Sequence, residues 1–135
     1  MKTLKLFILL TFMVITSTTI NAQFKLAQWP ALKTFHGVMS ETFHPSEEGK
    51  LEPIKTRSGE MYQKAVAVSK STVPADLKNQ KGIKTAVADL VKGTKELDAL
   101  IKAKATDEVI KTKLVGLHDT FHKIIETCNK DDEKH

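Results

Sequence analysis

The sequence predicts an all-α protein: an up-down-up-down antiparallel four-helix bundle that follows a cleaved signal peptide. Apolar residues recur with a period close to 3.5 in four blocks, as they do in helical bundles. Strand signals are nearly absent, because aromatic residues are few and β-branched residues fall at helical rather than alternating positions. Short connections between long helices imply that neighbouring helices are antiparallel.

Residues 1–22 have the features of a secretory signal peptide. Lys2 and Lys5 form a basic start, about ten to twelve mostly apolar residues follow, and the small residue Ala22 marks the cleavage site. This apolar run is shorter than the roughly twenty residues that cross a bilayer, so we expect no membrane span in the mature chain. The sequence therefore predicts export, to a periplasm or to the extracellular space.

The mature chain is expected to form one domain, residues 23–128, followed by a charged, disordered tail at residues 129–135. Cleavage leaves about 19 basic and about 16 acidic residues, which is a mild surplus of positive charge. The lysines are scattered among acids, and Arg57 is the only arginine. This distribution is typical of a solvated helix surface and argues against nucleic acid as a partner.

The first two blocks are separated by a proline and a glycine. The first is predicted to run from about residue 26 to Phe43 and to stop at His44 and Pro45, because a residue before proline is pushed out of helical geometry. Its inward seam comprises Trp29, Leu32, His36, Met39 and Phe43. The second block follows residues 46–49, whose serine and acids resemble the start of a helix. Its inward positions are Leu51, Ile54, Ser58, Met61, Ala65 and Val68.

The last two blocks keep the same spacing. Residues 73–76 close the second block, and Asp76 or an earlier residue is expected to start the third. The third block turns inward Ile83, Val87, Leu90, Thr94, Leu97 and Ile101. Thr106, followed by two acids, is predicted to cap the fourth helix. Its inward positions are Ile110, Leu114, Leu117, Phe121, Ile124 and Cys128.

Cys128 is the only cysteine, so the chain has no internal disulfide and depends on packing for its stability. We expect it to be a small buried residue near a helix end. The alternatives are an intermolecular disulfide, which would give a homodimer, and a metal thiolate.

Two histidines, His118 and His122, are the strongest chemical signal, because their spacing stacks both imidazoles on one helix face. His36 lies on the apolar seam of the first block, and matching antiparallel helix ends puts it level with His118. These three imidazoles predict a zinc, copper or iron site. The alternatives are that His36 is a core histidine with a satisfied hydrogen bond and that His122 is an ordinary surface residue.

The fourth ligand would decide the cofactor. Met39 or Met61 would favour copper(I) or haem, whereas Glu60 would favour zinc or non-haem iron. Glu60 lies well off the seam of the second block and Met61 lies on it. Both methionines are also natural gap-filling residues of a core.

His44 is about 12 Å along the helix from His36, too far to share its metal. We expect His44 to end the first helix or to line an opening of the bundle with Glu47 and Glu48. No glycine-rich phosphate loop occurs, and the acids lie mostly on polar faces. The sequence therefore indicates binding rather than turnover.

An exported, all-helical chain of this size with histidines in its last helix resembles the periplasmic four-helix-bundle cytochromes. The b-type members hold haem between a methionine of the first helix and a histidine of the last. The resemblance implies Met39 with His118 or His122 as axial ligands, and Arg57 for a haem propionate. Met39 lies in the second half of its block, whereas the b-type methionine lies near the start, so His36 and His118 form the better axial pair by level. The c-type members bind haem covalently, which a single cysteine excludes.

The leading hypothesis is a small exported four-helix bundle that binds a transition metal ion through His36, His118 and His122 and handles it without turnover. The second is a haem-b electron carrier with a redox partner. The third is a metal-free helical interaction protein in which the histidines have no ligand.

Overall fold

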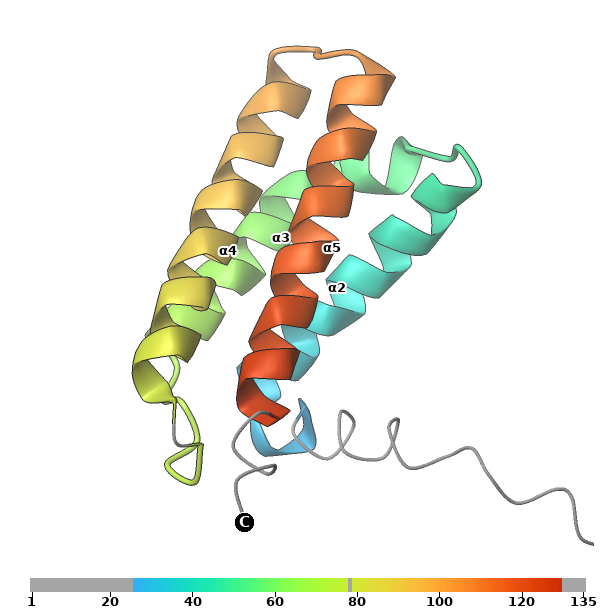
Figure 1. Ribbon diagram of the computed structural model, residues 1–135. Coiled ribbons are helices and arrows are strands. Elements are labelled where there is room, and N and C mark those ends of the chain that lie inside the picture. Colours follow the sequence, from blue (N-terminus) through green and yellow to red (C-terminus); the bar gives the residue numbers. More distant parts are fainter. Residues whose placement is uncertain (1–25, 78, 130–135) are drawn as a thin grey trace, which may run out of the picture.

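The computed structural model describes residues 26–77 and 79–129. Its main elements are α2 (Pro30–Glu47), α3 (Glu52–Lys70), α4 (Gln80–Lys102) and α5 (Asp107–Asn129) (Figure 1). The described residues contain no strand, and the prediction of an all-α protein is confirmed. None of the helices in this part of the chain is long and apolar enough to cross a membrane. The predicted signal peptide and residues 130–135 of the predicted C-terminal tail lie outside the described residues, whereas Asn129, predicted as the first residue of that tail, is the last residue of α5.

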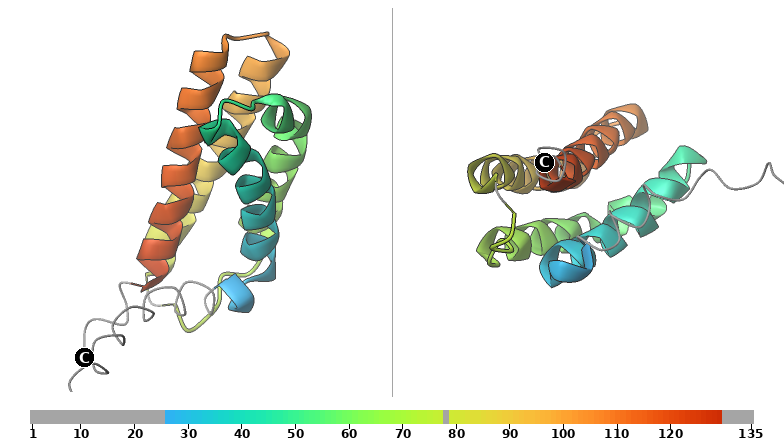
Figure 2. Two further views of the ribbon diagram at one scale, coloured as in Figure 1. Left: turned by 90° about the vertical axis from the view of Figure 1, so that its right-hand side faces the viewer. Right: turned by 60° about the horizontal axis from the view of Figure 1, so that its bottom comes forward.

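Helices that are consecutive in the chain pack against each other, and α2 also contacts α5, less extensively. Figure 1 shows α4 and α5 side by side and running in opposite directions. In the right-hand view of Figure 2, α2 and α3 form a second layer beside this pair. The first and last of the four helices therefore meet along a seam between the two layers.

The predicted end of the first helix is wrong, because α2 continues through His44 and Pro45 to Glu47. Proline disfavours helical geometry in the residue before it and removes one backbone donor. In this last turn, however, Phe43 and Ser46 are buried on either side of the proline. The Ser46 hydroxyl donates to the Phe43 carbonyl oxygen at 2.5 Å. Burial of these side chains holds the turn in helical form.

Residues 46–49, predicted as the start of a helix, instead form the end of α2. Gly49 has a φ of +79°, the left-handed conformation that glycine adopts most readily. The Gly49 N–H donates to the Ser46 carbonyl at 3.0 Å, and the Lys50 N–H donates to the Pro45 carbonyl at 2.9 Å. These two bonds form a Schellman motif, which satisfies carbonyl groups at the helix end.

Helix α4 ends in the same way, but with a lysine in the left-handed position. Lys104 has a φ of +56°. Its N–H donates to the Ile101 carbonyl, and the Ala105 N–H donates to the Leu100 carbonyl, both at 3.0 Å. A side chain therefore occupies a backbone conformation that favours glycine.

The starts of α4 and α5 are capped by local side chains. The Asn79 side chain accepts from the Gly82 N–H at 3.1 Å, so Asn79 caps the start of α4, and the prediction of Asp76 or an earlier residue is wrong. Thr106 accepts from the Val109 N–H at 3.4 Å, and α5 begins directly after it, which confirms this predicted cap.

The predicted inward positions form the core. All of them are buried except His36 and Ile101, which are half-buried. Cys128 is buried as expected. Phe35 is fully buried although it lies beside the predicted seam of α2. A helix that packs against two neighbours buries a stripe wider than a single seam.

Candidate functional site

The seam between α2 and α5 is joined by two stacks, each of an imidazole on a phenyl ring. The Phe43 ring of α2 lies parallel to the His118 ring of α5, with centroids 3.8 Å apart and an interplanar angle of 4°. The His36 ring of α2 stacks on Phe121 of α5, with centroids 5.1 Å apart and an angle of 16°. Each helix therefore contributes one histidine and one phenylalanine.

These stacks set the register of the two helices. The sequence put His36 level with His118, but in the structure His36 meets Phe121, and His118 meets Phe43. The difference is about one helical turn. It arises because the phenyl rings, the larger groups at this seam, take the positions opposite the imidazoles.

His118 and His122 face each other on α5. Their Nε2 atoms are 3.1 Å apart, and the ring centroids are 4.4 Å apart at 75°. At this distance one Nε2–H donates to the other ring's Nε2. Two imidazole ligands about 2.0–2.1 Å from one metal ion are themselves about 2.9–3.4 Å apart when they bind at adjacent positions. The pair thus has the spacing of a two-nitrogen chelate.

Burial and mutual repulsion favour the neutral imidazoles that a metal requires. Burial lowers the pKa of His36, and the nearby His122 and His44 lower it further. Burial and His122 also lower the pKa of His118, although Asp119 and Glu47 act in the opposite direction.

His44 lies on the exposed side of α2, where its Nδ1 is 3.1 Å from Glu47 Oε2. His44 therefore contacts Glu47, one of the two acids with which it was expected to line an opening, and the alternative that His44 ends the helix is wrong.

The residues predicted to bind a haem or to serve as a fourth metal ligand are Met39, Met61, Arg57 and Glu60. Met39 and Met61 are fully buried in the hydrophobic core. Arg57 donates through Nη1 to Glu41 at 2.6 Å and through Nε to Glu60 at 2.7 Å. These two carboxylates raise the pKa of Arg57, and Arg57 lowers the pKa of Glu60. Arg57 thus links α2 and α3 by ion pairs.

Across the described ranges, no group of three or more histidine, cysteine, aspartate or glutamate side chains is arranged to hold a metal ion. Of the three predicted ligands, the structure brings His118 and His122 into direct contact. His36 approaches them through Phe121, whose ring centroid is 5.9 Å from that of His122.

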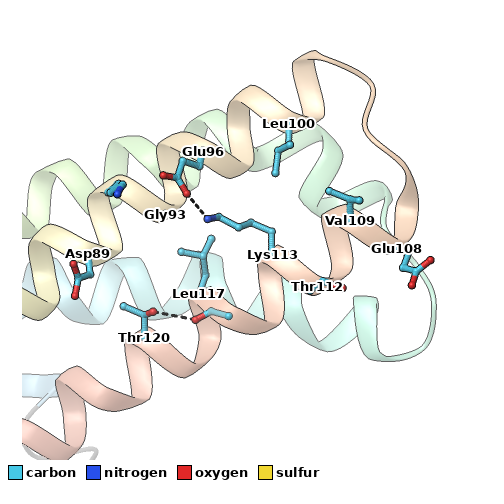
Figure 3. Close-up of a pocket in the computed structure, with 12 residues that line it drawn as sticks. Asp89, Gly93, Glu96, Leu100, Glu108, Val109, Thr112, Lys113, Leu117 and Thr120 are labelled. Carbon is cyan, nitrogen blue, oxygen red and sulfur yellow. Dashed lines mark hydrogen bonds and ion pairs between the residues drawn. The ribbon is translucent and has the colours of Figure 1, made fainter.

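A groove of about 620 Å³ between α4 and α5 was missed by the sequence analysis (Figure 3). An ion pair between Lys113 and Glu96 spans it from one helix to the other. Gly93 and Gly116 both line it. A Cβ at Gly93 would lie 2.5 Å from Leu117 Cδ2, whereas a Cβ at Gly116 would meet nothing within 4 Å. These two glycines are the signal that could have indicated a close approach of the helices and an open trough.

The groove contains none of the predicted ligands, so the aromatic and histidine-lined seam between α2 and α5 is the better candidate site. Comparisons with protein-family models, curated proteins and solved structures found no match to this chain.

Proposed function

We propose that this chain is an exported up-down-up-down four-helix bundle, released from its signal peptide, that binds a transition metal ion at the seam between α2 and α5. His118 and His122 supply the two chelating nitrogens. His36 belongs to the same site and supports the pair through the ring of Phe121. The role is metal binding or handling rather than turnover.

The observation that carries this proposal is the 3.1 Å separation of the two Nε2 atoms. Two histidines four residues apart on a helix can adopt many side-chain conformations, and most of these do not bring both Nε2 atoms together. In this seam the Phe43 ring lies flat on His118 and restricts its orientation. A metal ion can then replace the hydrogen bond between the rings with little rearrangement.

The chemistry of the pair supports zinc, copper or iron, because imidazole is a ligand for all three. It also supports binding near neutral pH, since the pKa of His118 is lowered by burial and by His122.

Titration calorimetry of the mature chain with Zn²⁺ and with Cu²⁺ at about pH 7.5 tests the proposal. We expect His118→Ala and His122→Ala each to weaken binding at least tenfold, and His36→Ala to weaken it less. His44→Ala is the matched control, because His44 is an exposed histidine already bonded to Glu47. Equal affinities in the wild type and the His118→Ala variant would contradict the proposal.

The purified mature chain also distinguishes the two other hypotheses. A Soret band in the purified protein would indicate haem. The absence of both haem and measurable metal affinity would favour a metal-free helical interaction protein.

A further inference from the structure

The His118–His122 pair lies at the edge of an exposed stripe of α5. His122, Val115, Asp119 and Glu126 follow one another at intervals of three and four residues and are all exposed. Val115 is one of the exposed large apolar side chains, with 40% of its surface accessible. A metal ion held by the pair, beside Phe43 of α2, would therefore also be open to solvent along this stripe.

Two imidazoles fill half of a tetrahedral zinc shell. The described part of the chain offers no group of three metal-ligating side chains around the pair. Two further ligands can approach from the exposed side of α5, and a second copy of the chain carries the same pair on the same kind of surface.

The charges on α5 fit an antiparallel contact with a second copy. Suppose that a two-fold axis crosses α5 at the level of Thr120, midway between the two histidines. Residues that precede Thr120 in one copy then lie opposite residues that follow Thr120 in the second copy. Because the helix rises 1.5 Å per residue, Asp119 is offset by about 3 Å along the helix axis from the second copy's Lys123. Lys111 is likewise offset by about 4.5 Å along the helix axis from the second copy's Glu126, and both side chains are long enough to bridge such an offset. All four residues are exposed.

We propose that one zinc ion joins two copies of this chain, with the His118–His122 pair of each copy supplying two of four imidazole ligands. The second copy packs antiparallel along α5, and ion pairs of Lys111 with Glu126 and of Asp119 with Lys123 flank the metal on both sides. This inference rests on the proposed function, because it needs the same pair to bind the ion.

Sedimentation equilibrium of the mature chain at about 50 μM, with a reducing agent present to prevent disulfides through Cys128, tests the proposal. We expect a monomer in EDTA and a dimer after addition of half an equivalent of Zn²⁺. His118→Ala and His122→Ala should stay monomeric, and the control variant His44→Ala should dimerise like the wild type. A monomer that binds one zinc ion per chain would overturn the dimer but leave the proposed function standing. A chain that binds no zinc would overturn the dimer, and a chain that binds neither Zn²⁺ nor Cu²⁺ in calorimetry would overturn both.

A charge exchange tests the antiparallel geometry. Lys111→Glu puts two acids opposite each other and should raise the dimer dissociation constant in zinc on the order of fivefold. Adding Glu126→Lys to that variant should restore the wild-type value, because the pair is re-formed with reversed charges. A double variant as weak as the single one, or a single variant unchanged from the wild type, would overturn this arrangement. Circular dichroism of the exposed-site variants shows whether each is folded.

Discussion

Lys104 holds a left-handed backbone conformation at the end of α4, with a φ of +56°. A Cβ in this region costs on the order of 1 kcal/mol, and glycine avoids the cost. We therefore expect Lys104→Gly to raise the free energy of unfolding by about 0.5–1 kcal/mol, measured by urea denaturation.

Gly49 provides the control, since it holds the equivalent position in α2 with a φ of +79°. Gly49→Ala should lower the free energy of unfolding by about 1 kcal/mol, because it introduces the strain that Lys104→Gly removes. If both variants shift the free energy of unfolding in the same direction, backbone strain at these two positions does not determine the effect.

His36 makes stability depend on pH. Burial, then His122 and His44, lower its pKa in the folded protein, so the unfolded chain binds a proton more readily. The stability that neutral His36 contributes is fully present above the pKa of about 6.5 in the unfolded chain. This stability is lost as the pH falls below that value. In EDTA, we expect the urea midpoint to fall between about pH 7.5 and pH 5.5.

The His36→Gln variant isolates this effect, because glutamine keeps a polar side chain but does not titrate. Its urea midpoint should change less over the same pH range, whatever its stability at pH 7.5. An identical pH dependence in the variant and the wild type would mean that the pKa of His36 is the same in the folded and unfolded chain.

At the scale of the helices, Gly93 sets how closely α4 and α5 approach. The Cδ2 atom of Leu117 occupies the space where a Gly93 side chain would begin. We expect Gly93→Ala to destabilise the protein by about 1 kcal/mol, because the clash with this buried leucine exceeds the gain in helix propensity.

Gly116 is the matched control on the facing helix, since a Cβ there meets nothing within 4 Å. Gly116→Ala should stabilise the protein by about 0.5–1 kcal/mol through helix propensity alone. Thermal unfolding of both variants checks the pair. A stabilised Gly93→Ala variant would show that Leu117 moves aside into the groove without cost.

The period of the apolar residues predicted which face of each helix is buried, because many residues along a helix report the same face. The end of α2 at Glu47 and the start of α4 after Asn79 were not predicted correctly, since a single cap or proline competes with burial that only the folded chain reveals. The spacing of His118 and His122 predicted that they share one face of α5, and the structure brings their Nε2 atoms into contact there. The position of His36 does not, because it depends on how phenyl rings of a different helix fit the seam.

At the scale of the whole molecule, a ligand that binds only the folded state stabilises it. Zinc at about one hundred times its dissociation constant should add about 2.7 kcal/mol and raise the melting temperature by several degrees. The increase should disappear in His118→Ala and should shrink as the pH is lowered, because a proton competes with the metal for each imidazole. An increase that persists in His118→Ala, measured by differential scanning calorimetry, would place the metal elsewhere on the chain.

Among the four described helices, α2 and α5 are the only contacting pair that are not neighbours in sequence. The contact of α2 with α5 therefore closes the longest loop of the chain and has the largest entropic cost of loop closure. The hairpins α2–α3, α3–α4 and α4–α5 form from local contacts. The seam that carries both imidazole–phenyl stacks is then the last part of the molecule to assemble and the first to open in native-state hydrogen exchange. Any ion that binds His118 and His122 selects chains in which folding has been completed.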